Sequence, residues 1–296
     1  MRNYNSHITT AVLAGMLAFG LQACQSKAPI ELAPPTLEVM WNTPGFASPE
    51  SVMLSADKSF LYVSNIDGTA RDHDGNGYIS KLGKDGKILK EKWARGLDAP
   101  KGMALNADKL YVSDIDKLVE IDTKSGEILN TISVEGASFL NDVAYIPGLG
   151  VLVSGSATQS IYLYDGTTMS VWLNDDHLKG INGLHVDGDC LLIVTMSAGE
   201  LLSLDVKTKQ ITVIAGGMED ADGIKILADG SYFMSSWPGR LFHVSKDGKT
   251  TLLQDTREQN LNMNDFDLDG DTAYMANYGS NTVQAIKLTQ VAKPIT

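Results

Sequence analysis

Residues 180–196 read GINGLHVDGDCLLIVTM: a polar residue beside a short apolar run, a turn of Asp and Gly, and a second apolar run. This pattern predicts two antiparallel strands joined by a tight turn. The same unit recurs in five other segments, namely 48–65, 99–114, 139–155, 220–236 and 262–278. Repetition of one strand pair along a chain is typical of repeat architectures.

The spacing of the unit predicts how many strands each repeat holds. Its polar marker residues stand at 50, 101, 141, 182, 222 and 264, so successive spacings are 51, 40, 41, 40 and 42 residues. Two more strand-like runs follow each pair, joined by turns such as Lys84-Asp85-Gly86. Four strands repeated every ~40–45 residues indicate an all-β fold, the β-propeller, here with six blades.

The two ends of the repeat array predict how the ring closes. The last unit has only three strands after Asn264, whereas LEVMW at 37–41 is a strand without a partner at the front. We expect this N-terminal strand to become the outer strand of the last blade. Residues 37–296 are therefore predicted to form one propeller domain.

The N-terminus reads as an export signal. Arg2 precedes an apolar run at 11–21 that is too short to span a bilayer and suits a signal peptide. The run ends in Leu21-Gln22-Ala23-Cys24, which resembles the bacterial lipobox. We predict a lipoprotein signal peptide at 1–23 and a lipidated Cys24 with a polar tether at 24–36. The alternative is an ordinary cleaved signal that leaves Cys24 a thiol.

The charge and cysteine content of the chain limit the classes of partner that it is expected to bind. Loss of residues 1–23 removes one cation, so the formal net charge goes from −12 to −13. An acidic chain argues against nucleic acid and offers no basic membrane patch, which leaves the lipid as the membrane contact. The other cysteine, Cys190, is predicted to be a buried thiol. Gln25 after Cys24 favours outer-membrane sorting facing the periplasm, and we expect a monomer.

The stretch RDHDGNGYISKLG at 71–83 looks like a calcium loop. Asp72, Asp74 and Asn76 match positions 1, 3 and 5 of an EF-hand, but Gly83 stands where the bidentate glutamate is needed. The flanking residues have strand patterns, so we exclude an EF-hand and place the stretch between the second and third strands of blade one. It is either a solvated turn or a secondary calcium site, and it would overhang the channel.

The starts of the innermost strands are the best candidate site, because in a propeller they converge on one end of the channel. Any one Asn or Asp beside a glycine is more often a turn residue. Equivalent positions in successive blades instead suggest a set of oxygen ligands, which Ca²⁺ prefers. The six residues are Glu50, Lys101, Asn141, Asn182, Asp222 and Asn264.

This arrangement resembles the regucalcin/gluconolactonase/luciferin-regenerating-enzyme superfamily. The resemblance implies one Ca²⁺ or another divalent cation, held by Glu50 in SPESV, Asn141 in LNDV, Asn182 in INGL and Asp222 in ADGI. Two positions depart from the pattern: Phe139 replaces the arginine of the sugar-lactone members, and blade two supplies Lys101. Sugar-acid lactones are therefore doubtful substrates.

The resemblance implies a hydrolase in which the cation polarises a lactone or ester carbonyl and Asp222 is the general base. Candidate substrate-binding residues are Lys101, Phe139, Asp142, Asn264, Trp237 and Tyr278. The alternative is a non-catalytic propeller that binds a small ligand or a partner protein over the same channel. Lys101 and Phe139 favour that alternative, because they alter the substrate side of the site and spare the metal side.

Overall fold

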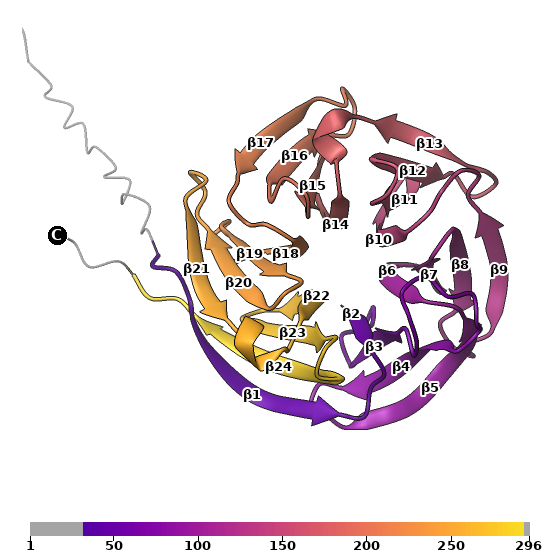
Figure 1. Ribbon diagram of the computed structural model, residues 1–296, viewed down its shortest axis with the longest axis horizontal. Coiled ribbons are helices and arrows are strands. Elements are labelled where there is room, and N and C mark those ends of the chain that lie inside the picture. Colours follow the sequence, from indigo (N-terminus) through magenta and orange to yellow (C-terminus); the bar gives the residue numbers. More distant parts are fainter. Residues whose placement is uncertain (1–31, 293–296) are drawn as a thin grey trace, which may run out of the picture. The chain divides into compact units, whose positions relative to one another are not determined.

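The computed structural model describes residues 32–292, which form six four-stranded antiparallel sheets arranged in a ring around a central axis (Figure 1). Two single-turn 3-10 helices, η1 (Asp176–Leu178) and η2 (Arg257–Gln259), are the helical elements of this part of the chain. The six-bladed, all-β prediction is confirmed. The predicted signal peptide, Cys24 and most of the tether lie outside the described residues.

The blades follow one another along the chain, each running from an inner to an outer strand. Blade one has β2 (Pro49–Leu54), β3 (Phe60–Asn65), β4 (Gly77–Gly83) and β5 (Ile88–Leu97). Blade two has β6 (Pro100–Asn106), β7 (Lys109–Asp114), β8 (Lys117–Asp122) and β9 (Ile128–Ser133). Blade three has β10 (Leu140–Ile146), β11 (Gly150–Gly155), β12 (Ser160–Tyr164) and β13 (Met169–Asn174).

The second half of the ring repeats this order. Blade four has β14 (Ile181–Asp187), β15 (Cys190–Thr195), β16 (Leu201–Asp205) and β17 (Ile211–Ala215). Blade five has β18 (Ala221–Ile226), β19 (Tyr232–Ser236), β20 (Arg240–Val244) and β21 (Thr250–Asp255). Blade six has β22 (Met263–Asp269), β23 (Thr272–Asn277), β24 (Thr282–Thr289) and β1 (Thr36–Pro44).

The ring closes through its first and last strands, as the sequence predicted. β1 pairs antiparallel with β24 from Thr36 opposite Thr289 to Pro44 opposite Thr282. The indole N–H of Trp41 also donates a hydrogen bond to the carbonyl of Lys84 in blade one, at 3.0 Å. The N-terminal strand therefore joins the last blade to the first.

The apolar core lies between neighbouring blades. One cluster, for example, joins Val52 and Leu61 of blade one to Tyr274 and Val283 of blade six. The inner strands β2, β6, β10, β14, β18 and β22 contact one another in a closed circle. Cys190 is only partly buried at the start of β15, rather than in this core as the sequence suggested.

A β-bulge interrupts every inner strand at its marker residue. In blade one Pro49 pairs with Asn65 and Val52 with Val63, so Glu50 and Ser51 together oppose one residue. The same slip occurs in all six blades. In blade one the hydroxyl of Ser64 accepts a hydrogen bond from the N–H of Ser51 at 2.9 Å, so this backbone group has a partner despite the bulge. Bulges redirect side chains, and here each one lies at the channel mouth.

In five blades, a residue in the left-handed region stands two positions before the marker. Its carbonyl accepts the N–H of the residue just after the second strand. The left-handed residues are Ser48, Phe139, Gly180, Asp220 and Asn262, and their donors are Ile66, Ser156, Met196, Trp237 and Tyr278. For a bulky residue such as Phe139, whose φ is +61°, this conformation is strained.

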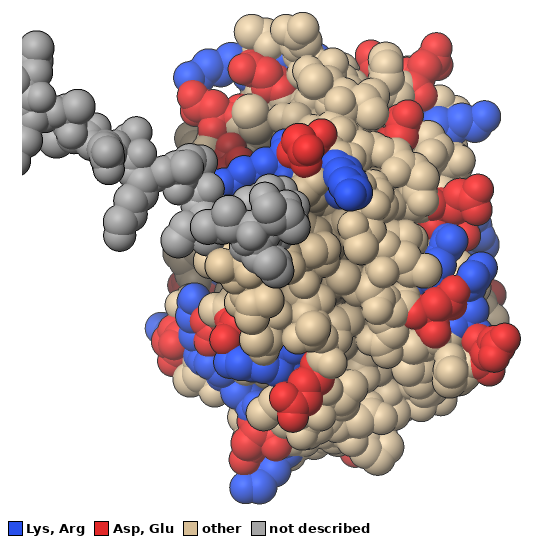
Figure 2. Space-filling view, turned by 90° about the vertical axis from the view of Figure 1, so that its left-hand side faces the viewer, with Lys and Arg blue, Asp and Glu red and all other residues tan. Residues whose placement is uncertain are grey.

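The outer surface is mixed in charge on the face shown in Figure 2. There the basic side chains lie among acidic ones, and a broad area between them carries few charges. None of the helices within residues 32–292 has the length and apolar character needed to cross a membrane.

Candidate functional site

The six marker residues meet at one mouth of the channel. They line a cavity of about 260 Å³, the mouth cavity, and each is at most 5% exposed. The bulges place them there from six different blades. The members of this set are Glu50, Lys101, Asn141, Asn182, Asp222 and Asn264.

Three oxygen atoms in this cavity are buried without a hydrogen-bond partner among the described residues. They are Oε2 of Glu50, Oδ1 of Asp222 and Oδ1 of Asn264. A buried acceptor left unpaired costs about 1–3 kcal/mol, and more when it is charged. All three therefore have coordination capacity that the protein itself does not use.

Burial and nearby carboxylates destabilise the charge of both acidic residues of the mouth cavity. Burial, then repulsion by Asp222, raises the pKa of Glu50 well above its ordinary value, and Lys101 only partly opposes this. Burial, then repulsion by Asp265 and Asp142, raises the pKa of Asp222 well above its ordinary value. A bound cation would remove this penalty, because it favours the ionised form of both groups.

Lys101 is turned into the protein rather than into solvent. Its ammonium donates hydrogen bonds to the carbonyl of Ala99 at 3.0 Å and to that of Ala70 at 3.4 Å. It lies 4.8 Å from the ring centroid of Phe139. Burial lowers the pKa of Lys101, while the charge of Glu50 raises it. Lys101 therefore supplies part of the positive charge that Glu50 requires.

The donor set of the mouth cavity fits a hard cation such as Ca²⁺. Glu50 and Asp222 provide carboxylate oxygens with unused lone pairs, and Asn141 and Asn182 provide amide oxygens. Within residues 32–292 no group of three or more His, Cys, Asp or Glu side chains is placed to hold a metal ion. A cation at the mouth would therefore depend on the two asparagines.

Apolar side chains form the wall above this polar floor. Phe139, Trp237 and Tyr278, proposed from the sequence as substrate contacts, all line the cavity. Sequence reasoning missed Ile66 and Met196, which line it as well. The alignment of the repeats could have identified them, because Ile66, Met196, Trp237 and Tyr278 each follow the second strand of a blade.

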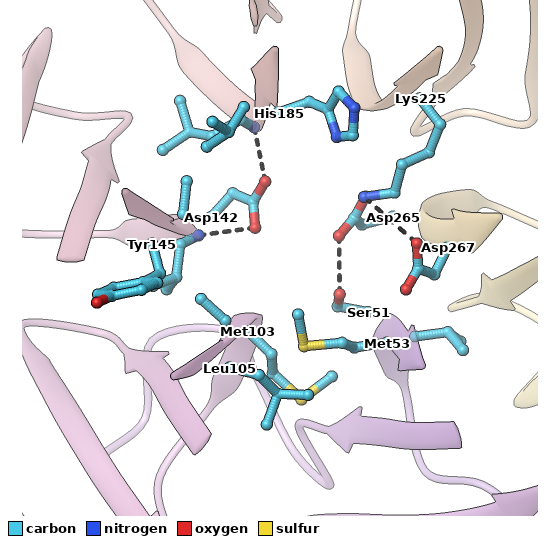
Figure 3. Close-up of a pocket in the computed structure, with 16 residues that line it drawn as sticks. Ser51, Met53, Met103, Leu105, Asp142, Tyr145, His185, Lys225, Asp265 and Asp267 are labelled. Atoms are coloured by element: carbon cyan, nitrogen blue, oxygen red, sulfur yellow. Dashed lines mark hydrogen bonds and ion pairs between the residues drawn. The ribbon is translucent and has the colours of Figure 1, made fainter. Parts of the chain in front are cut away.

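Asp142 does not line the mouth cavity, although it was grouped with the substrate contacts. It lies in a second cavity of about 280 Å³, built from the later residues of the inner strands (Figure 3). Its carboxylate accepts the N–H of Leu184 at 2.6 Å and that of Val143 at 2.7 Å. Burial, then repulsion by Asp265, raises the pKa of Asp142 to about 8.

The other carboxylates of the second cavity also have partners. Asp265 accepts the Ser51 hydroxyl at 2.8 Å, and Asp267 accepts the N–H of Leu54 at 2.9 Å. Asp267 also lies 3.9 Å from the ammonium of Lys225. Most of these contacts join neighbouring blades, so this cluster fastens the inner ring together.

The loop that resembles a calcium site lies between β3 and β4 and has strands on both sides, as expected. Both carboxylate oxygens of Asp74 accept hydrogen bonds from Asn76, one from its backbone and one from its side chain. Asp72 is exposed. Ile66 and Ala70, from the first half of the loop, line the mouth cavity, so the loop does overhang the channel.

Comparison with known proteins supports the fold. A family model described as "Outer membrane protein assembly factor BamB" matches residues 97–215, a segment without Glu50 or Asp222. The structure of virginiamycin B lyase from Staphylococcus aureus is similar, with 13% identity, a TM-score of 0.61, and coverage of 86% of this chain and 100% of that one. An inactive variant of that lyase with Quinupristin has 12% identity, a TM-score of 0.60 and the same coverage. No curated protein matches the chain.

Proposed function

We propose that this protein is a calcium-dependent hydrolase of lactones or esters that acts at the mouth cavity. The observation that carries the proposal is the set of buried, unpartnered oxygens of Glu50, Asp222 and Asn264 in one small cavity. The one-for-one resemblance of Glu50, Asn141, Asn182 and Asp222 to the ligands of the regucalcin/gluconolactonase superfamily supports it.

In this mechanism Glu50, Asn141, Asn182 and Asp222 would hold the cation, and Asp222 would also move the proton. A divalent cation supplies, when bound, positive charge that polarises an ester carbonyl. Water adds to the carbonyl carbon, and its proton passes to the Asp222 carboxylate. The C–O bond to the leaving oxygen then breaks, and that oxygen takes the proton, which gives an acid and an alcohol, or one hydroxy acid from a lactone. The apolar wall limits access of bulk water.

A binding propeller without catalysis is the second candidate. The match of residues 97–215 to the assembly-factor model favours it, because that model describes a protein named for assembly rather than catalysis. Lys101 favours it as well, since a fixed cation beside Glu50 reduces the need for a metal. In that case the mouth would hold a small ligand or a segment of a partner protein.

A hydrolysis assay separates the two candidates. The chain from Gln25 onward keeps every strand of the closed ring, and it would be tested on a lactone and ester panel with Ca²⁺ and with a chelator. The hydrolase proposal predicts turnover that requires Ca²⁺ and is lost in Asp222→Asn. Bound Ca²⁺ without turnover of any compound would favour the binding propeller.

We also propose that the protein is a lipoprotein anchored through Cys24 in the bacterial outer membrane, facing the periplasm. The lipobox-like Leu21-Gln22-Ala23-Cys24 supports this proposal. Stable anchoring takes two or more acyl chains, so Cys24→Ser should move nearly all of the protein out of the membrane fraction or leave it uncleaved. Fractionation and mass spectrometry of the N-terminal peptide test this, and an unmodified Cys24 on soluble mature protein would refute it.

A further inference from the structure

The wall of the mouth cavity is a second ring built on the same repeat as its polar floor. All six blades present a floor residue at the bulge, and four of them also present a wall residue just after the second strand. Ile66, Met196, Trp237 and Tyr278 occupy that second position and line the cavity. Their N–H groups bond to the left-handed residues at the strand starts, so the backbone fixes the wall directly above the floor.

Phe139 completes this wall from blade three and is held firmly. The guanidinium of Arg71, from the loop between β3 and β4, lies 4.3 Å from the ring centroid of Phe139. The ammonium of Lys101 lies 4.8 Å from the same centroid. Two cation–π contacts and a constrained backbone fix the ring, so Phe139 is a preorganised apolar surface rather than an adaptable side chain.

The chemistry of the wall differs from that of the floor. Ile66, Met196 and Phe139 have no hydrogen-bonding group beyond the weakly accepting sulfur of methionine. Trp237 and Tyr278 each have one polar atom on a large apolar ring. Each substrate hydroxyl buried against this wall without a partner would lose about 1–3 kcal/mol, whereas each buried CH₂ group would gain about 0.8 kcal/mol.

We propose that the substrate is a small lactone or ester with a hydrocarbon body, and that Phe139, Trp237 and Met196 determine this preference. This inference rests on the proposed function and adds the class of substrate to it. The carbonyl end would face the polar floor and the hydrocarbon body the wall. A polyhydroxylated sugar lactone of the same ring size would be rejected.

Three six-membered lactones with the same reacting ring test the inference: δ-valerolactone, δ-nonalactone and glucono-δ-lactone. The Ca²⁺-loaded chain from Gln25 onward should give a kcat/KM for δ-nonalactone at least about 100-fold above that for glucono-δ-lactone, after subtraction of spontaneous hydrolysis. The unsubstituted δ-valerolactone should fall between them. Equal or better turnover of glucono-δ-lactone would overturn this inference and leave the hydrolase proposal standing. No turnover of any ester or lactone would overturn both.

Variants of the wall residues test which side chains cause the preference for a hydrocarbon substrate. Trp237→Ser should lower the ratio of kcat/KM for δ-nonalactone over δ-valerolactone at least about fivefold. Because Trp237 is exposed, we expect this variant to fold. Phe139→Ser should lower it further. Val213→Ser, on the exposed outer strand β17, is the matched control and should leave the ratio unchanged. An unchanged ratio in both wall variants would contradict the assignment.

Discussion

The two ends of the channel contain the same kinds of side chain in opposite states. At the second cavity Asp142, Asp265 and Asp267 all accept hydrogen bonds from backbone or serine groups (Figure 3). At the mouth cavity Glu50 and Asp222 keep buried oxygens without a partner. Glu50, Asp222 and Asp142 are all buried, and burial raises the pKa of each. Acidic residues alone therefore do not identify a site, whereas unused coordination capacity does.

The difference follows from the bulges. Adjacent residues of a regular strand point to opposite faces, and the bulge instead gives each inner strand two neighbouring residues that both approach the channel. The first of the pair lines the mouth cavity, and in blades three and six the second, Asp142 or Asp265, accepts a hydrogen bond from the next blade. In these two blades the bulge thus places a candidate site residue and a residue that stabilises the ring at adjacent positions of one strand.

The largest effect is expected from a variant that removes hydrogen bonds at the second cavity. Asp142→Ala removes the acceptor of two backbone N–H groups, and it leaves Leu184 N–H buried without its partner. Denaturant unfolding should show a loss of about 3 kcal/mol, while Ca²⁺ affinity changes by less than about threefold. Asp142→Asn keeps one acceptor oxygen and should lose roughly half as much. A large loss of Ca²⁺ binding in folded Asp142→Ala would show that Asp142 belongs to the calcium site and would contradict the separation of the two cavities.

A smaller effect concerns His185, which lines the second cavity. Burial, together with the charge of Lys225, lowers the pKa of His185 to about 3. Below pH ~6.5 the unfolded chain takes up a proton here that the folded chain does not, so stability falls as the pH falls from 6.5 toward 3. Between pH 7 and pH 5 wild type should lose about 1–2 kcal/mol more than His185→Gln. Equal losses in the two proteins would show that His185 is not the cause.

The mouth cavity should respond to pH through its metal affinity. Because the pKa values of Glu50 and Asp222 are raised, protons compete with Ca²⁺ for these carboxylates more strongly than for carboxylates with ordinary pKa values. Affinity should therefore fall as the pH falls, by roughly tenfold between pH 7.5 and pH 5.5. Calorimetry in two buffers of different ionisation enthalpy would measure the released protons. A pH-independent affinity without proton release would contradict this assignment.

Lys101 gives the smallest of these effects. Its charge offsets part of the negative charge of the mouth cavity and repels a cation. Lys101→Met keeps most of the side-chain volume, and it should tighten Ca²⁺ binding about fivefold at pH 7.5. If Lys101→Met instead weakened Ca²⁺ binding, Lys101 would be a structural support of the site rather than a competing charge.

Much of the fold was accessible from sequence because its signals are local. Strand alternation, turn residues and the spacing of about 40 residues predicted six blades, and the unpaired LEVMW predicted the closure through β1. The same alignment predicted that Glu50, Lys101, Asn141, Asn182, Asp222 and Asn264 would meet. Each of these conclusions depends only on the order and period of the repeats.

The remaining features depend on register, which spacing does not reveal. The bulge decides that Asn141 lines the mouth and Asp142 the second cavity, although the two are adjacent. The direction of Lys101 depends on two carbonyls, one of them Ala70 in a loop from another blade. The left-handed backbone of Phe139 likewise has no signal in its residue type.

Calorimetric titration of the chain from Gln25 onward with Ca²⁺ measures whether the mouth cavity is the calcium site. Wild type should bind one Ca²⁺, and Glu50→Gln and Asp222→Asn should each weaken binding at least about 100-fold, because each removes a charged ligand from a small site. Asp72→Ala, in the loop between β3 and β4, should change the affinity by less than about twofold. Loss of binding in Asp72→Ala with binding retained in Glu50→Gln would place the calcium site in the loop and contradict its assignment to the mouth cavity.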